Sequence, residues 1–241
     1  MATQSAAVLI TRPKSEGDAF AAALVARFGP RVRPVVSPLL APRNLTPDLP
    51  DQDYAAVVFT SAQAVEAAGP YLPRLPRQAW CVGAKTARAA SLAGFDARSG
   101  GGDGDALVRA LAADPPKGSI LYLRGVDTAF NLLERLREFG IDADEAVVYL
   151  QSPQDLGPEA LDLLRQRTDV IVPLFSPRSA RLFRAALPKA AQARLHIAAM
   201  SANVAEALQD LPRAHLTIAL RPDAPAMLDA VETLLVQLPA P

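Results

Sequence analysis

The sequence predicts an α/β protein built from parallel sheets, and three observations carry this prediction. Short apolar runs rich in Val, Ile and Leu alternate with segments in which apolar residues recur at spacings of three and four. Most of the short runs are apolar throughout, as expected for strands covered by helices on both faces. Three junctions between a run and the following helical segment also recur in order in the second half of the chain, which indicates two related lobes.

The apolar runs predict nine strands, and helical periodicity is clearest in three of the segments between them. The predicted strands are 7–11, 33–37, 54–60, 79–83, 119–124, 145–150, 169–176, 196–201 and 216–220. The clearest helical segments are 17–28, 129–140 and 201–211. Gly94 and Gly140 are suitable helix ends, because glycine adopts the left-handed backbone that terminates many helices.

The repeat pairs residues at similar places in the two halves. Arg12 and Arg124 follow the strand-like runs "VLIT" and "LYL" and are 112 positions apart, Thr60 pairs with Ser176, and Thr86 pairs with Ser201. The identities are few, and generic α/β chains can mimic such a pattern. The residues alone leave open whether the lobes are consecutive. The extended, proline-flanked segments 33–42 and 147–153 would suit paired crossings between them.

Composition excludes several classes of protein. Among 241 residues, half of them apolar, 25 Lys and Arg balance 25 Asp and Glu, so the long-range positive field of a nucleic-acid-binding protein is not expected. The single cysteine, Cys81, excludes an internal disulfide framework, and two isolated histidines are too few for a metal cluster. No signal peptide and no apolar run long enough to span a membrane is seen. We therefore expect a cytoplasmic protein without a membrane or nucleic-acid partner.

Small hydroxyl residues stand where predicted strands pass into helices. They are Thr60, Ser61, Thr86, Ser176 and Ser201. Open α/β sheets bind ligands at the carboxyl ends of their strands, and the free amides of a first helical turn attract anions. A simple helix N-cap is the alternative interpretation, and for any one of these positions taken alone it is the better one. If the hydroxyl residues of both lobes faced one ligand, binding of acidic groups would be favoured over simple capping.

Two glycine-containing segments resemble nucleotide motifs without fulfilling them. "CVGAKTARA" places Lys85-Thr86 after a strand, but Ala84 and Ala79 stand where a phosphate loop requires glycine. The cluster 100–104 lacks the spacing of a dinucleotide fingerprint. It is interpreted as a loop that could close over a ligand, with Asp103 or Asp105 capping the next helix.

Arginine and tyrosine side chains at strand ends are the remaining candidates for chemistry. Arg12 and Arg124 occupy equivalent places after strands, where guanidinium groups suit carboxylates. Tyr149 closes the strand 145–150, and its phenol could donate a proton, although for the residue taken alone packing at a strand end is the favoured role. Trp80 and Cys81 lie inside a strand and are expected in the core. No nucleophile elbow or pair of catalytic carboxylates stands out.

Seven segments, in this order, resemble those of the uroporphyrinogen-III synthase family. They are "LITRP", "VVFTSAQAVEA", "CVGAKTARAASLAGF", "ILYLRG", "GIDADEAVVY", "LFSPRSARLF" and "AMSANVAEAL", and they cover nearly the whole chain. No single segment is specific to the family, but the ordered combination is. Ala199-Met200 stand where many members have Gly-Pro, which affects only the detail of that turn.

The resemblance implies a fold and an activity. It implies two α/β lobes joined by a two-segment linker with the active cleft between them, residues 1–36 and 150–241 forming one lobe and 37–149 the other. The implied reaction closes the linear tetrapyrrole hydroxymethylbilane to uroporphyrinogen III, with loss of water and inversion of ring D, using no metal or other cofactor. A monomer is expected.

The resemblance also assigns roles to single residues. Tyr149 matches the family tyrosine that assists departure of the hydroxyl group. The residues matching substrate-binding positions are Arg12, Thr60, Ser61, Thr86, Ser176 and Ser201.

Two other functions remain as alternatives. A non-catalytic two-lobed binding protein for a small polyanionic ligand would share the architecture and the anion-binding helix ends. A nucleotide-sugar transferase with two Rossmann lobes is disfavoured, because each lobe would have only about 110 residues and lacks phosphate motifs.

Overall fold

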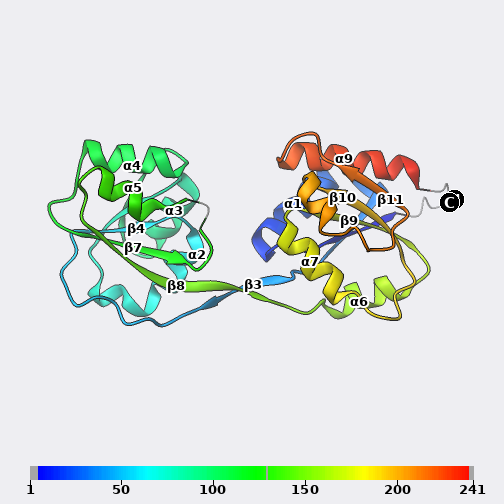
Figure 1. Cartoon of the computed structure of the whole chain (residues 1–241), viewed down its shortest axis with the longest axis horizontal. Coiled ribbons are helices and arrows are strands. Elements are labelled where there is room, and N and C mark those ends of the chain that lie inside the picture. The colour runs from blue at the N-terminus through cyan, green and yellow to red at the C-terminus, as the bar shows by residue number, and fades with distance from the viewer. Residues whose placement is uncertain (1–4, 129, 239–241) are drawn as a thin grey trace. The chain divides into compact units, whose positions relative to one another are not determined.

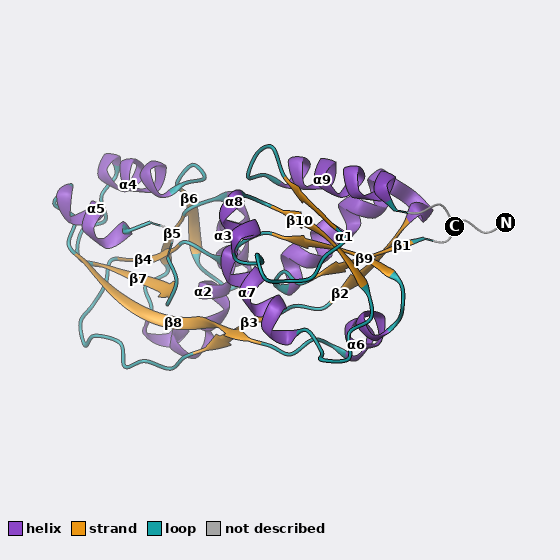
Figure 2. Ribbon diagram, turned by 45° about the vertical axis from the view of Figure 1, so that its right-hand side comes forward, coloured by secondary structure: helices purple, strands orange, loops and turns teal. Residues whose placement is uncertain are grey.

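The structure is a computed structural model that describes residues 5–128 and 130–238. Contacts between Cα atoms divide the chain into two compact units (Figure 1). Unit 1 comprises Met1–Ala41 and Pro153–Pro241, and unit 2 comprises Pro42–Ser152. Each unit contains a sheet with helices packed against both faces (Figure 2).

Unit 1 is built on a five-stranded parallel sheet in the order β11-β10-β9-β1-β2. Its strands are β1 (Ala6–Ile10), β2 (Val32–Val36), β9 (Asp169–Leu174), β10 (Arg194–Ala199) and β11 (His215–Ile218). Its helices are α1 (Lys14–Phe28), α6 (Pro158–Arg165), α7 (Pro177–Ala186), α8 (Ala202–Glu206) and α9 (Ala224–Gln237), with a short 3-10 turn η1 (Gly29–Arg31). Apolar residues of α1 and α9 cover one face of the sheet, and those of α6, α7 and α8 cover the other.

Unit 2 is built on the strands β8-β7-β4-β5-β6, which pair in parallel, with β3 added beside β8. The strands are β3 (Leu40–Asn44), β4 (Ala56–Phe59), β5 (Gln78–Cys81), β6 (Asp96–Ser99), β7 (Ile120–Gly125) and β8 (Ala143–Pro153). The helices are α2 (Ala62–Ala67), α3 (Ala84–Leu92), α4 (Gly104–Ala113) and α5 (Leu132–Glu138), with the 3-10 turn η2 (Gly69–Arg74). Helices α2 and α3 pack on one face, and α4 and α5 on the other.

The two sheets have the same internal order. β2-β1-β9-β10-β11 in unit 1 corresponds to β8-β7-β4-β5-β6 in unit 2, and equivalent strands other than β2 and β8 are followed by equivalent helices. The first half of the chain gives β1-α1-β2 to unit 1 and β4 through α4 to unit 2. The second half gives β7-α5-β8 to unit 2 and β9 through α9 to unit 1. The repeat in the sequence therefore corresponds to a repeat in the structure. In each half of the chain, the first βαβ segment belongs to one unit and the remainder of that half belongs to the other unit.

The predicted α/β class with mostly parallel, doubly covered sheets is confirmed, and the differences are local. Strands β3 and β6 are absent from the predicted set. Both are edge strands whose residues are largely exposed, so neither has the apolar signal of a buried strand. The helix predicted over 201–211 is shorter, because α8 ends at Glu206 and the chain continues in turns. The helix predicted over 129–140 is α5, and residue 129 lies outside the described part of the chain. Gly94 and Gly140 follow α3 and α5 with positive φ angles of 97° and 71°.

Trp80 and Cys81 lie in β5 with 5% and 0% of their surface exposed, which confirms that both belong to the core. Burial raises the pKa of the Cys81 thiol to about 12. A fully buried thiol with a raised pKa is poorly suited to act as a nucleophile. No helix within residues 5–128 and 130–238 is long and apolar enough to cross a membrane.

Candidate functional site

The hydroxyl residues fall into three structural classes. Ser61 and Ser176 are N-caps of α2 and α7, and each side chain accepts the backbone N–H of the third helical residue at 3.1 Å. The capping interpretation is therefore correct for both. Ser201 occupies the N-cap position of α8 but makes no side-chain cap hydrogen bond. Thr60 precedes a cap, and Thr86 lies inside α3.

These positions correct two pairings inferred from the repeat. The cap Ser61 is the structural counterpart of the cap Ser176, and Thr60 is therefore not. The N-cap of α3 is Gly83, so Gly83 and not Thr86 corresponds to Ser201. Thr86 is the third residue of α3, in its first turn and only 6% exposed, so it does not occupy the cap position.

In unit 2, tyrosines from within β7 and β8 reach the two consecutive hydroxyl residues just past the carboxyl end of β4. The Thr60 Oγ1 lies 3.1 Å from the Tyr122 hydroxyl, and the Ser61 Oγ lies 3.0 Å from the Tyr149 hydroxyl. Tyr122 is 2% exposed, and burial raises its pKa, with the hydrogen bond to Thr60 acting in the opposite direction. Tyr149 is half-buried and packs at the edge of the core between the sheet and α2. The structure thus joins three predicted site residues, Thr60, Ser61 and Tyr149, in one cluster.

Arg124 borders this cluster and is held by a carboxylate. Its Nε and Nη2 donate to the two Glu145 carboxylate oxygens at 2.8 and 2.7 Å, and its Nη1 donates to the carbonyl oxygen of Gly125 at 2.9 Å. The hydrogen bond from Arg124 lowers the pKa of Glu145 and raises that of Arg124. Arg124 therefore organises this end of the sheet, and its charge is already neutralised.

In unit 1, Arg12 follows β1 and has no such partner. Its guanidinium carbon lies 4.0 Å from the centre of the Phe175 ring, a cation–π arrangement. Within the described part of the chain it makes no ion pair or side-chain hydrogen bond, although Glu16 is near enough to raise its pKa. Burial is the larger influence and lowers that pKa. A half-buried, unpaired guanidinium on an aromatic ring is well suited to bind a carboxylate.

The glycine cluster 100–104 is tied to the end of β5. The backbone N–H groups of Gly100 and Gly102 donate to the carbonyl oxygens of Cys81 and Val82, both at 2.7 Å. Gly101 and Gly102 have φ angles of 106° and 111°, which explains why glycine is needed there. Asp103 caps α4 by accepting the Ala106 N–H at 2.7 Å, as one of the two predicted alternatives requires. The loop is thus hydrogen-bonded to the residues at the end of β5, and its closing over a ligand stays a prediction.

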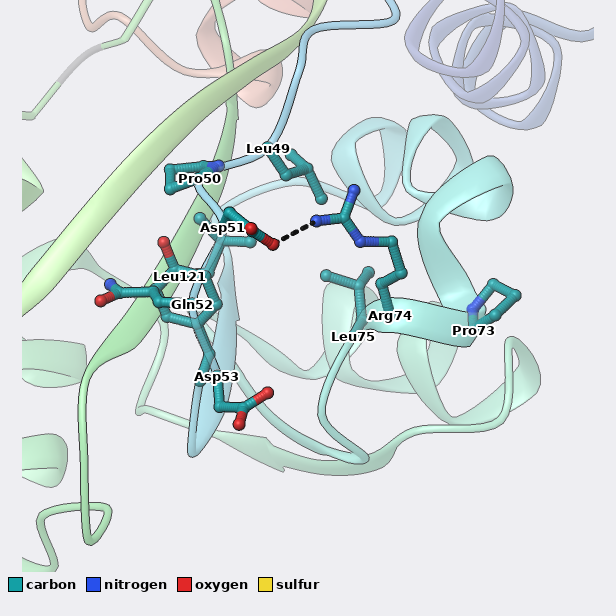
Figure 3. A pocket seen from close by; sticks show the side chains of 10 residues that line it. Leu49, Pro50, Asp51, Gln52, Asp53, Pro73, Arg74, Leu75 and Leu121 are labelled. Atoms are coloured by element: carbon teal, nitrogen blue, oxygen red, sulfur yellow. Dashed lines mark ion pairs between the residues drawn. The ribbon is translucent and has the colours of Figure 1, made fainter.

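A pocket of about 460 Å³ lies elsewhere in unit 2 (Figure 3). It is lined by residues before β4 and around η2, among them Asp51 and Asp53, and Arg74 points toward Asp51 at 3.7 Å. The lining residue Leu121 lies near the start of β7, whereas Thr60 and Ser61, the hydroxyl residues of the candidate site, lie just past the end of β4. Two carboxylates in the lining make the pocket unfavourable for an acidic ligand. We therefore place the candidate site at the strand ends and not in this pocket.

Tyr122, Gly125 and Glu145 were not singled out from the sequence as site residues. Tyr122 interrupts an otherwise aliphatic strand, which is a usable signal for a polar group near a strand end. Glu145 stands at the start of a strand with a charge that needs a partner.

Within residues 5–128 and 130–238, no group of three or more His, Cys, Asp or Glu side chains could hold a metal ion.

The fold and these strand ends define a class of protein with two α/β units, each bearing polar side chains at the carboxyl edge of a parallel sheet. The particular family is given by sequence: the family described as Uroporphyrinogen-III synthase HemD matches residues 18–229. The chain therefore belongs to the uroporphyrinogen-III synthase family, whose members are enzymes of porphyrin biosynthesis. None of the curated proteins compared with the chain by sequence matches it.

A solved structure supports the fold. The crystal structure of uroporphyrinogen-III synthetase from Helicobacter pylori 26695 is similar with a TM-score of 0.60 at 20% identity, covering 96% of this chain and 100% of that one. A mutant uroporphyrinogen III synthase from the extremely thermophilic bacterium Thermus thermophilus gives a TM-score of 0.47 at 20% identity, with coverage of 97% and 100%.

Proposed function

We propose that this protein is a hydro-lyase that closes hydroxymethylbilane to uroporphyrinogen III, with loss of water and inversion of ring D. The observation that carries the proposal is membership of the family over residues 18–229, together with a tyrosine hydroxyl held at the strand ends of unit 2. In this proposal the two compact units act as the two lobes of the family, and residues of both bind one substrate molecule. No cofactor is invoked.

Selectivity between isomers is the chemical problem that such an enzyme must solve. In water the bilane loses its hydroxyl group and closes without inversion, so the enzyme must direct attack to the substituted carbon of ring D. Control of this kind comes mainly from positioning the two reacting ends, an effect that can contribute several kcal/mol or more. We assign positioning to groups that bind the acidic side chains of the substrate. They are Arg12, Thr60, Thr86, Ser176 and Ser201 and the backbone amides at nearby helix starts.

Tyr149 is proposed as the general acid. Its phenol proton leaves with the hydroxyl group as water when the C–O bond breaks, and the proton that the substrate loses after ring closure restores the phenol. A positioned proton donor contributes on the order of 10²–10⁴-fold to such a step. The support for this role is that Tyr149 is only half-buried while its hydroxyl is already oriented by Ser61.

The test is incubation of the protein with freshly made hydroxymethylbilane, followed by chromatographic analysis of the product isomer. The proposal expects isomer III, formed faster than the spontaneous reaction. Isomer I alone, at the spontaneous rate, would contradict it and would favour the non-catalytic binding protein. Saturable binding of the bilane without turnover would identify that alternative directly.

A further inference from the structure

A β-bulge places Tyr149 on its face of the unit 2 sheet. Strands β7 and β8 pair in regular register from Ile120 with Ala143 to Arg124 with Val147, but the next pair joins Gly125 to Tyr149. Val148 is therefore an extra residue in β8. Side chains alternate between faces along a strand, so one inserted residue reverses the face of everything that follows it.

The packing of β8 shows the effect of the inserted residue. Ala146 and Val148 belong to the core under α2 and α3, whereas Ala143 belongs to the core under α4 and α5. Regular alternation would put Tyr149 on the second face, with Ala143. Tyr149 instead packs with Ala146 and Val148 on the face of α2 and α3. The bulge thus turns the phenol toward the start of α2.

Gly125 supplies the space for the Tyr149 ring. A Cβ atom at Gly125 would lie 2.6 Å from the Tyr149 Cζ and 2.9 Å from its hydroxyl oxygen, closer than real Cβ contacts occur. The φ of Gly125 is not in the left-handed region, so backbone conformation does not require glycine there. The requirement is set by the tyrosine ring, which lies against the bare backbone of β7.

Ser61 fixes the direction of the Tyr149 hydroxyl. Its Oγ accepts the Ala64 N–H at 3.1 Å and lies 3.0 Å from the Tyr149 hydroxyl. A serine oxygen that accepts one hydrogen bond retains one proton to donate. When that proton goes to the Tyr149 oxygen, the phenol proton is left free to point away from the protein.

We infer that Ser61 and Gly125 are positioning residues for Tyr149, acting with the bulge at Val148 to hold its hydroxyl ready for proton donation. This inference rests on the proposed function for its catalytic consequence, while its geometric part is independent of that function. Ser61 thereby acquires a second role besides capping α2.

The test combines kinetics with a spectroscopic signal from Tyr149. The protein is labelled with tyrosine carrying ¹³C at Cζ, and the Tyr149 resonance is identified by its loss in Tyr149→Phe. Gly125→Ala and Ser61→Ala are expected to shift this resonance and to lower kcat roughly 10- to 100-fold with little change in KM, because displacement of a reacting group by about 1 Å can cost that much. Ser61→Thr, which keeps a hydroxyl, is expected to restore both.

Matched controls separate positioning from general damage. Gly69→Ala adds a methyl group that meets nothing within 4 Å, and Asp103→Ala removes the N-cap of α4 in the same unit. Neither is expected to move the Tyr149 resonance or kcat. The inference is overturned if Gly125→Ala and Ser61→Ala leave kcat at the wild-type value, or if the Tyr149 resonance does not shift in either. If the wild-type protein forms no isomer III, the proposed function fails, and the resonance alone still decides the geometric part.

Discussion

Equivalent arginines at the ends of the two sheets have different surroundings. Val36 pairs with Ile10, two residues before Arg12, just as Glu145 pairs with Tyr122, two residues before Arg124. Unit 2 therefore has a carboxylate where unit 1 has an aliphatic side chain. Arg124 is neutralised by two hydrogen bonds to Glu145, and Arg12 lies over the Phe175 ring without an ion-pair partner among the described residues.

The residues that precede the helix caps also differ between the two units. Thr60 precedes the cap Ser61 and bonds to Tyr122, whereas Phe175 precedes the cap Ser176 and packs under Arg12. Unit 2 thus has two hydroxyl pairs just past the end of β4, Thr60 with Tyr122 and Ser61 with Tyr149, and unit 1 has a cation on an aromatic ring. One duplicated fold can therefore carry two kinds of site, because strand-end side chains change without affecting the core. We propose that unit 2 handles the proton and unit 1 binds a carboxylate.

The largest effect is expected for Tyr149→Phe. Removal of the phenol oxygen eliminates the proposed proton donor while the ring still fills the space beside Gly125. We expect kcat to fall on the order of 10²–10⁴-fold, with unchanged thermal unfolding. Initial rates of isomer III formation measure the change. Near-normal turnover would show that Tyr149 is not the proton donor, and the proposed difference in function between the units would then be wrong.

A smaller effect, on a different kinetic parameter, is expected for Arg12→Gln. An unpaired guanidinium that binds a substrate carboxylate contributes about 1.5–3 kcal/mol, which corresponds to a rise in KM of roughly 10- to 100-fold. Thermal stability should change little, since no ion pair among the described residues is broken. Steady-state kinetics with the bilane measure the effect. An unchanged KM would show that the free charge of unit 1 does not meet the substrate.

The matching change in unit 2, Arg124→Gln, should act on stability. It leaves the Glu145 carboxylate without its bidentate partner, at a cost of roughly 1–3 kcal/mol, toward the lower end because Glu145 is about one-third exposed. Arg124 lowers the pKa of Glu145, so the stabilisation is complete above the ordinary pKa near 4.5 and is lost as pH falls through the lowered value. Denaturant unfolding at pH 7 and at pH 3 should therefore show a larger difference between wild type and variant at the higher pH. An equal difference at both pH values would contradict the ion-pair explanation.

The smallest effects are expected at the two serines that begin helices of unit 1. Ser176→Ala removes a cap hydrogen bond and should cost about 1 kcal/mol, or a fall in melting temperature of about 2–4 °C. Ser201→Ala removes no cap hydrogen bond and should cost less. Thermal unfolding of the two variants gives the comparison. If both variants lost the same stability, the claim that the Ser176 side chain stabilises its helix by capping and the Ser201 side chain does not would be contradicted.

The fold could be predicted largely from the sequence because buried parallel strands have a strong local signal. Runs such as 169–176 are apolar on both faces, and the following serine or threonine indicates where a helix begins. Weak local signals account for the errors. β6 is an exposed edge strand, and the apolar spacing of 201–211 continues after α8 has ended.

The candidate site could be predicted only in part. Tyr149 and the hydroxyl residues at strand ends are visible in the sequence, and Arg12 follows from the repeat. The bulge at Val148 is not visible, because "EAVVYL" is compatible with a regular strand that would put Tyr149 on the opposite face. The difference between Arg12 and Arg124 depends on cross-strand partners, Val36 and Glu145, which no local pattern pairs with them.

The most direct test of the division of labour between the units is a double-mutant cycle of Arg12→Gln and Tyr149→Phe. The account predicts that the double variant has the raised KM of the first and the lowered kcat of the second, with free-energy changes that add within about 0.5 kcal/mol. If Arg12→Gln instead lowered kcat, and lost that effect once Tyr149 was replaced, both residues would serve one step and the account would be contradicted.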